Sequence, residues 1–300
     1  MRIGITGATG VIGRAVGTLA AGHGHQVVAF TRDPARSASL GFASEVRPVD
    51  ARAAEPLDAS DLDVLVHLAG EPVLGLWTES KKQRIRDSRV DFTQRLVRCL
   101  AAASPRPVSL LCASAIGIYG DRGDELLDEA SAPGEGFLAG VCKDWEASAK
   151  RAEQLGMRVV HLRTGIVLAN EGGAFKLMSK AFELGLGGRL GAGGQWMSWI
   201  HLLDEARLIL WAAERQDFQG HINLVAPGPV TNAEFTRVLA KALHRPAFMH
   251  APAFALRLAM REAASVLLDS QRVMPNLALA HGFQFDCPTL ESALAALLTN

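Results

Sequence analysis

The segment Gly7-Ala8-Thr9-Gly10-Val11-Ile12-Gly13 decides how this chain folds, because of what stands on either side of it. It follows a strand-like stretch, Arg2–Thr6, and opens an apolar-striped helix over Val11–Ala21 that stops at Gly22. In such a turn the first glycine permits a tight bend, the second lets the backbone approach a pyrophosphate, and the third lets helix and strand pack closely. The alternative is a purely structural glycine turn. We predict a dinucleotide site, contacted by Gly7, Thr9, Gly10, Val11, Ile12 and Gly13.

The second strand, Val27–Phe30, is a continuous apolar run of the kind found in buried parallel strands. It leads into Thr31-Arg32-Asp33-Pro34, where an NAD-binding protein usually places an acidic residue for the ribose 2′-hydroxyl. Arg32 instead suits the 2′-phosphate of NADP, while Asp33 before Pro34 is explained as a helix-start residue. We therefore predict NADP(H), with Thr31 and Arg32 in contact with it. The alternative is that Arg32 is only exposed to solvent and contacts no cofactor.

Strand and helix patterns alternate along the first half of the chain. Further strands are predicted at 46–49, 64–68, 108–113 and 159–163, with helices over 80–103 and 143–155. This alternation predicts an α/β protein with a Rossmann-like, doubly wound parallel sheet.

The regular alternation of strand and helix patterns ends after residue 168. Glycine-rich loops are predicted around 172–173 and 185–194, then a short strand at 199–201, a helix over 204–215, and a helix-dominated segment from 232 onward. We predict a nucleotide-binding core over 1–167, rejoined by about 195–226. Residues 168–194 and 227–300 would form a smaller, helix-rich C-terminal lobe, with the binding cleft between the two.

Composition excludes several classes of protein. The 300 residues carry 31 basic and 31 acidic side chains, so the surplus of positive charge typical of nucleic-acid or anionic-membrane binding is missing. The four cysteines show no C-x-x-C spacing, no His/Cys/Asp cluster has metal-ligand spacing, and no run of about 18 apolar residues occurs. We expect a cytoplasmic protein with no metal, no nucleic-acid partner and no membrane span.

With these residues placed, the chain resembles the extended short-chain dehydrogenase/reductase superfamily, and within it an atypical epimerase-like family with a small C-terminal domain. The resemblance rests on motifs spread over nearly the whole chain. They include the glycine turn, Leu68-Ala69-Gly70-Glu71-Pro72, Asp87-Ser88-Arg89-Val90, Ser114–Gly120, Asp144-Trp145-Glu146, Arg163–Leu168, Gly194–His201 and Thr231–Phe235.

The resemblance implies further cofactor contacts. Leu68, Ala69 and Gly70 would line the adenine ribose and phosphates with their backbone, and Arg89 would reach a phosphate or ribose, with Arg84 as a less certain neighbour. Thr164 and Val167 would lie at the nicotinamide end. Plain core packing is the alternative for Leu68, Ala69 and Val167.

The superfamily's chemistry uses a serine and a Tyr-x-x-x-Lys pair, and here the pattern departs. Ser114 occupies the serine position, but the expected pair falls on Leu138 and Cys142. The one tyrosine of the chain, Tyr119, stands in the strand-end motif instead. We name Ser114 and Tyr119 as candidate catalytic residues. Glu71, Lys143 and His201 are further acid–base candidates, and a structural role is the alternative for each of these three and for Tyr119.

The sequence leaves two alternative functions open. The first is an NADP(H)-dependent oxidoreductase or epimerase-like enzyme acting on an unknown small molecule. The second is a non-catalytic NADP(H)-binding regulatory or sensor protein, which the loss of the Tyr-Lys pair favours. Trp196 and Trp199 either wall a substrate pocket or pack under the C-terminal lobe. The polar outer faces of helices 80–103 and 143–155 favour a monomer.

Overall fold

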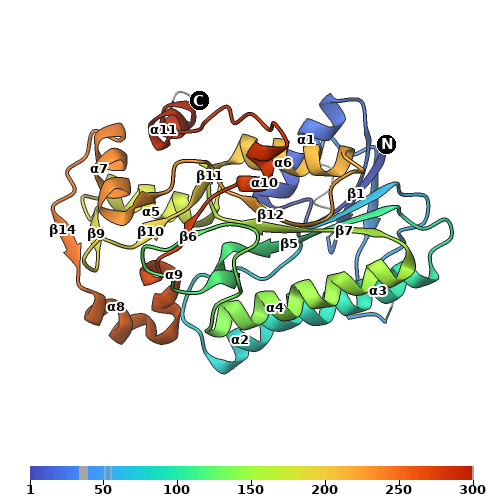
Figure 1. Cartoon of the computed structure of the whole chain (residues 1–300), viewed down its shortest axis with the longest axis horizontal. Coiled ribbons are helices and arrows are strands. Elements are labelled where there is room, and N and C mark those ends of the chain that lie inside the picture. Colours follow the sequence, from blue (N-terminus) through green and yellow to red (C-terminus); the bar gives the residue numbers. More distant parts are fainter. Residues whose placement is uncertain (34–39, 51, 55, 299–300) are drawn as a thin grey trace.

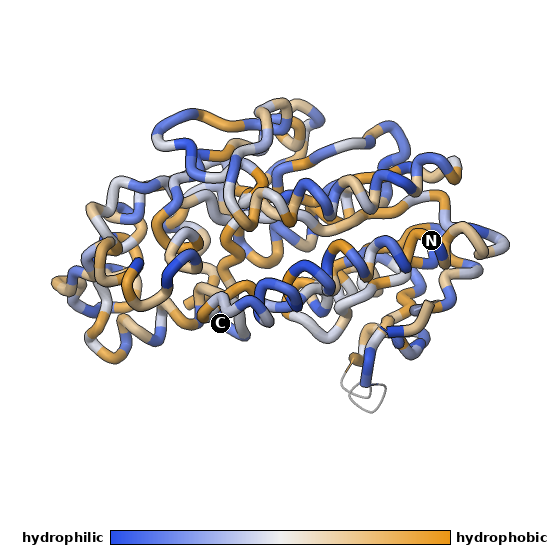
Figure 2. The backbone as a smooth tube through the Cα atoms, turned by 90° about the horizontal axis from the view of Figure 1, so that it is seen from below, coloured by the Kyte–Doolittle hydropathy of each residue, from blue (hydrophilic) through white to orange (hydrophobic). Residues whose placement is uncertain are grey.

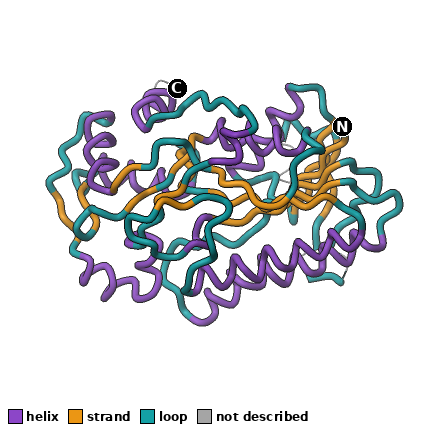
Figure 3. Tube along the Cα trace, viewed as in Figure 1, coloured by secondary structure: helices purple, strands orange, loops and turns teal. Residues whose placement is uncertain are grey.

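The computed structural model describes all residues except 34–39, 51, 55 and 299–300. A seven-stranded parallel sheet runs through the molecule in the order β12-β7-β5-β4-β1-β2-β3 (Figures 1 and 3). Its strands are β1 (Arg2–Thr6), β2 (Gln26–Thr31), β3 (Glu45–Pro48), β4 (Val64–His67), β5 (Ser109–Ala115), β7 (Arg158–Thr164) and β12 (Gly220–Leu224). The prediction of a Rossmann-like, doubly wound sheet is confirmed.

Helices cover both faces of the sheet, which is why the central strands are rich in buried apolar residues. On one face α1 (Val11–Gly22) packs beside α6 (Leu202–Glu214) over a core built from alternate residues of the strands. On the other face α3 (Phe92–Ala102) and α4 (Phe137–Lys150) pack over the remaining strand residues. The apolar run Val27–Phe30 contributes to both cores, because successive strand residues point to opposite faces.

The sheet is completed by a strand from far along the chain. β12 pairs with β7 along its full length, from Gly220 opposite Val160 to Leu224 opposite Thr164. Arg158, at the start of β7, is buried, and its guanidinium donates to the carbonyl oxygens of Phe218 (2.8 Å) and Ala212 (3.0 Å). These two acceptors lie on α6 and on the loop that leads from α6 into β12, so Arg158 fixes that loop to the sheet.

Most of the remaining segments pack together at one end of the sheet (Figure 1, left), whereas residues 276–285 pack against α6 and β12. A separate apolar core joins α5 (Gly173–Glu183), α7 (Asn232–Ala242) and α11 (Leu290–Leu298). Short paired strands connect this part: β8 (Ile166–Leu168) with β11 (Trp199–His201), β9 (Gly188–Leu190) with β14 (Met249–Ala251), β10 (Trp196–Met197) with β13 (Val230–Thr231), and β6 (Leu126–Leu127) with β15 (Arg272–Val273). Three further helices are α8 (Ala253–Met260), α9 (Ser265–Leu268) and α10 (Asn276–Ala280).

Three sequence-based boundaries need correction. The helix expected over 80–103 is α2 (Glu79–Arg86) and α3, joined by a π-helical turn at Asp87–Asp91. The helix expected from 143 begins at Phe137, because apolar residues at helical spacing before Lys143 already pack inward. The region after 168 holds α5, and the loop expected over 185–194 contains β9.

Hydropathy along the chain follows this packing. Figure 2 shows hydrophilic and hydrophobic residues alternating along the helices, as expected when one side of each helix packs inward and the other meets solvent. Within the described residues, no helix is both long and apolar enough to cross a membrane.

Candidate functional site

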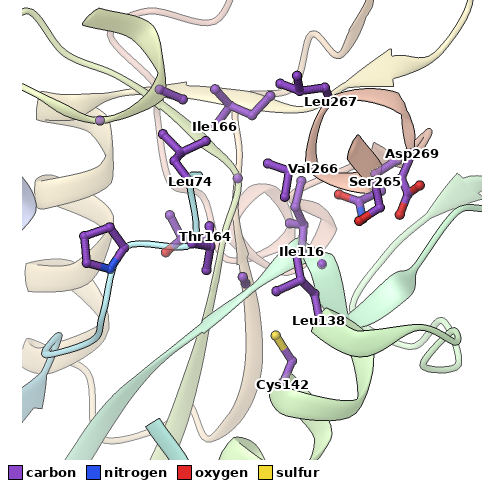
Figure 4. A pocket seen from close by; sticks show the side chains of 18 of the residues that line it. Leu74, Ile116, Leu138, Cys142, Thr164, Ile166, Ser265, Val266, Leu267 and Asp269 are labelled. Carbon is purple, nitrogen blue, oxygen red and sulfur yellow. The ribbon is translucent and has the colours of Figure 1, made fainter. Parts of the chain in front are cut away.

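A cavity of about 1070 Å³ opens at the carboxyl ends of the central strands. It lies where the strand order reverses, between β1 and β4, which is the usual ligand position in open α/β sheets. The ends of β1, β4, β5 and β7 line one wall, and residues 264–269 from the C-terminal part line another (Figure 4). The volume exceeds the range of about 300–1,000 Å³ typical of one small-molecule site, so it suits a dinucleotide together with a second ligand.

The glycine turn has the geometry that a pyrophosphate needs. Gly7 adopts a φ of +72°, and a Cβ on Gly13 would lie 2.3 Å from the Gly7 carbonyl oxygen, so both positions require glycine. A Cβ on Gly10 would meet only that same oxygen, at 3.2 Å, because this residue faces the open cavity. No side chain caps the N-terminus of α1, which leaves its first N–H groups available to an anion.

Most predicted cofactor residues are brought together around this cavity. Those that line it are Gly7, Gly10, Val11, Ile12, Gly13, Leu68, Gly70, Arg89, Thr164 and Val167. The structure places five others outside the lining, namely Thr9, Thr31, Arg32, Ala69 and Arg84. Of these, Arg32 is exposed immediately after β2, and the side chain of Arg84 is 57% exposed with Nε 3.7 Å from Glu71.

Arg89 is held rigidly beside the cavity. Its Nη1 donates to the carbonyl oxygen of Glu71 (2.9 Å), and its guanidinium lies over the ring of Trp145, 5.2 Å from the centroid. Burial lowers the pKa of this guanidinium. Gly70 lies against this group, since a Cβ on it would come within 3.3 Å of the Arg89 guanidinium.

Ser114, at the end of β5, lines the cavity and is tied to a buried ion pair. Its hydroxyl donates to Glu146 Oε1 (2.7 Å), and the same carboxylate accepts two hydrogen bonds from Arg163 (2.9 and 3.0 Å). His221 Nε2 lies 3.1 Å from Glu146 Oε2. Burial alone would raise the pKa of the Glu146 carboxyl, but its bonds to His221, Arg163 and Ser114 hold that pKa well below its usual range. Ser114 therefore directs its only proton at an ionised carboxylate.

Tyr119 does not reach the cavity. It is fully buried, and its hydroxyl lies within hydrogen-bonding distance of Asn223 Oδ1 (2.8 Å) and the Asp128 carbonyl oxygen (2.9 Å) while accepting from Arg163 (3.0 Å). Burial raises the pKa of this hydroxyl. Its position is that of a packed turn aromatic, the alternative interpretation of this residue.

Thr164 connects the cavity to a second buried carboxyl group. Its hydroxyl donates to Oε1 of Glu205 on α6 (2.8 Å), while Oε2 of Glu205 has no hydrogen-bond partner. The side chain of Glu205 is completely buried, and this burial raises its pKa to about 8. Glu205 is therefore largely protonated at neutral pH, unlike Glu146.

Leu138 and Cys142, the two positions onto which the resemblance places a Tyr-Lys pair, lie one turn apart on α4 and both line the cavity (Figure 4). Burial raises the pKa of the Cys142 thiol to about 11, so it is not a thiolate near neutral pH. Glu146 follows one further turn along the same helix. The Glu146 carboxylate therefore binds the Ser114 hydroxyl and does not line the cavity.

The other acid–base candidates are engaged elsewhere. Glu71 lines the cavity but is paired with Lys81 (2.8 Å), whose hydrogen bond lowers the pKa of the carboxyl. Lys143 is exposed and donates to the Gly134 carbonyl oxygen (3.3 Å). His201 accepts from the Leu203 N–H (3.3 Å) and so caps α6. Glu71 and His201 therefore make structural contacts, and Lys143 lies at the surface.

The two tryptophans have different positions. Trp196 lines the cavity, whereas Trp199 is buried in the core that joins α5, α7 and α11 and donates to the Gly228 carbonyl oxygen (2.9 Å). Across the part of the chain that the structure describes, no cluster of His, Cys, Asp or Glu is arranged to hold a metal ion.

Fold and site together define a dinucleotide-binding α/β protein. The sequence profile of the NAD dependent epimerase/dehydratase family matches residues 3–225, and a domain of unknown function matches residues 251–297. The chain belongs to this NAD dependent epimerase/dehydratase family. The expected resemblance is confirmed.

Relatives of similar length share this assignment. An epimerase family protein of Mycobacterium bovis is 39% identical over 300 residues, covering 99% of this chain and 97% of the relative. The epimerase family protein YfhF of Bacillus subtilis is 35% identical, covering 100% and 99%. Among solved structures, the human epimerase family protein SDR39U1, crystallised with NADPH, is 33% identical, covers 100% of both chains and superposes with a TM-score of 0.90.

Proposed function

We propose that this protein is an NADP(H)-dependent oxidoreductase of the epimerase-like type that acts on a small molecule. The observation that carries the proposal is the glycine turn, which opens the N-terminus of α1 into a cavity large enough for a dinucleotide and a second ligand. The human relative that was crystallised with NADPH supports this choice of cofactor.

The chain's own residues would bind and orient the two ligands. The free N–H groups at the start of α1 neutralise the pyrophosphate, and Arg32 after β2 pairs with the 2′-phosphate. When bound, NADPH supplies a hydride from its nicotinamide ring. Ser114 accepts a hydrogen bond from a substrate hydroxyl, because its own proton is committed to Glu146.

A non-catalytic NADP(H) sensor is the second candidate, and one observation favours it. The two cavity positions that would carry a Tyr-Lys proton relay hold Leu138, which has no ionisable group, and Cys142, whose thiol stays uncharged near neutral pH and cannot replace the lysine cation. Incubation with NADPH and a panel of aldehydes and ketones distinguishes the two candidates. Loss of the absorbance of reduced cofactor supports the enzyme, tight binding without turnover supports the sensor, and no NADPH binding refutes both.

We predict that Gly10→Val abolishes NADPH binding and leaves the fold intact. The new side chain would fill the space that the pyrophosphate requires, whereas the backbone conformation at Gly10 suits any residue. Calorimetric titration measures the affinity, and circular dichroism measures the fold. Gly22→Val, at the far end of the same helix where a Cβ meets nothing, is the matched control. Unchanged NADPH affinity of Gly10→Val would show that the turn is only structural.

We predict that NADPH binds more tightly than NADH because of Arg32. A hydrogen bond to a charged group contributes roughly 1.5–3 kcal/mol, so the preference should be on the order of 10- to 150-fold. Arg32→Ala should remove most of it, whereas Arg98→Ala, which changes an exposed arginine on α3, should not. Equal affinities of the native protein for the two cofactors would contradict this assignment.

A further inference from the structure

The substrate end of the cavity, away from the glycine turn, is walled by apolar side chains. Leu138 from α4, Ile116 from the turn after β5, and Val266 from α9 lie next to one another in Figure 4, with Cys142 below them. Leu74 lies across the cavity from this group. A ligand here would contact hydrocarbon on several sides.

The charged residues around the cavity provide no surplus of positive charge. Its described lining holds three basic and four acidic residues. Arg89 donates to two backbone carbonyl oxygens, and Glu262 is paired with Lys82. Arg257 and Arg261 are exposed, in the same segment as Glu262 and Asp269. The two diphosphate charges of a nucleotide sugar would meet Arg257 and Arg261 beside the carboxylates of Glu262 and Asp269, with no net positive charge to offset them, and incomplete pairing of a buried charge is costly.

The hydroxyl groups at the strand ends can match a single polar group of a ligand. Ser114 offers lone pairs, because its proton points at Glu146. Thr164 can either donate or accept, because it can exchange hydrogen-bond direction with the Glu205 carboxyl. Both residues line the cavity, so a carbonyl oxygen near the ends of β5 and β7 could accept a hydrogen bond from Thr164, and the hydroxyl formed on reduction could donate to Ser114, while the rest of the ligand remains in apolar surroundings.

We propose that the substrate is a neutral carbonyl compound with an apolar body, and not a nucleotide sugar. This rests on the proposed NADPH-dependent function of the same cavity. In the reaction, hydride from the nicotinamide forms a C–H bond at the carbonyl carbon. The π electron pair of C=O moves onto oxygen, which takes a proton from water, and NADPH is oxidised to NADP⁺.

Ligand binding tests the proposal without turnover. The protein is titrated calorimetrically with 2-decanone, benzophenone and UDP-glucose, each with and without NADP⁺. We expect at least one of the two ketones to saturate below about 1 mM and UDP-glucose not to bind. Binding of UDP-glucose in that range, or failure of both ketones, would overturn the proposal.

Variants locate the binding site. Leu138→Asn should weaken ketone binding at least about tenfold, because it replaces hydrocarbon contacts with a polar amide. Lys143→Asn, an exposed neighbour on the same helix, is the control. Val266→Asn, on the facing wall, is a second variant in case Leu138→Asn does not fold. Unchanged ketone affinity in a folded variant at either position would refute the assignment to this cavity.

The design separates this proposal from the proposed function. NADP⁺ and NADPH binding are measured first, in the absence of ketone. Ketone binding without cofactor binding would refute the NADPH-dependent function while retaining the apolar site. Cofactor binding without ketone binding would refute the apolar substrate site while retaining the NADPH-dependent function.

Discussion

Glu205→Gln is expected to gain stability relative to the native protein as pH rises. The folded protein holds this carboxyl with a raised pKa of about 8, compared with 4.5 for the unperturbed group. Between these two values the unfolded chain releases the proton more readily, so the native protein loses stability as pH increases, and a neutral amide does not. At about 1.4 kcal/mol per pKa unit, the difference that accumulates by pH 8 is on the order of 4 kcal/mol.

Thermal unfolding of the native protein and of Glu205→Gln between pH 5 and pH 8 measures this effect. The amide leaves one buried group without a partner, which adds an offset that does not change with pH, so the relevant quantity is the slope of the difference. Glu183→Gln, an exposed carboxyl group on α5, is the control. Parallel pH profiles for native and Glu205→Gln would show that the buried carboxyl is already ionised.

Glu146→Leu is expected to destabilise the protein by about 3–5 kcal/mol, because it leaves a buried guanidinium without its counter-ion. Arg163 is only 3% exposed and makes two of its hydrogen bonds to this carboxylate. Urea unfolding at pH 7 measures the loss.

The double variant Glu146→Leu/Arg163→Met separates this cause from general disruption of α4. Replacement of both charges with apolar groups removes the unpaired ion, so we expect it to recover much of the lost stability. The ion-pair explanation would be refuted if the loss of unfolding free energy in the double variant equalled the sum of the losses in Glu146→Leu and Arg163→Met.

The fold could be predicted because its decisive signals are local. The glycine turn and the apolar runs Val27–Phe30 and 64–68 specify buried parallel strands from neighbouring residues alone. The start of α4 is harder to predict from the sequence, because Gly136 and Gly140 interrupt the helical pattern there. Burial of Ala139 and Val141 against other elements overrides this weak local preference.

The candidate site was predictable only in part. The position of Ser114 at a strand end follows from its motif, and the four-residue spacing from Cys142 could have indicated Glu146. Burial of Tyr119 depends on Asn223, which is 104 residues away, and sequence spacing does not show that contact. Glu205 carries no local signal, since a carboxylate in the first turn of a helix is ordinarily a solvated residue that suits the helix dipole.

The pairing of β12 with β7 also affects how the chain is made. During synthesis β7 is complete at Thr164, but its partner strand ends only at Leu224, roughly 60 residues later. At about 5–20 residues per second, the nascent chain carries an open edge of valine and leucine for several seconds. Arg158 lacks its carbonyl acceptors during the same interval. An unpaired apolar edge is prone to aggregate, so a fragment that stops before β12 would keep this edge exposed and depend on chaperones to stay dispersed.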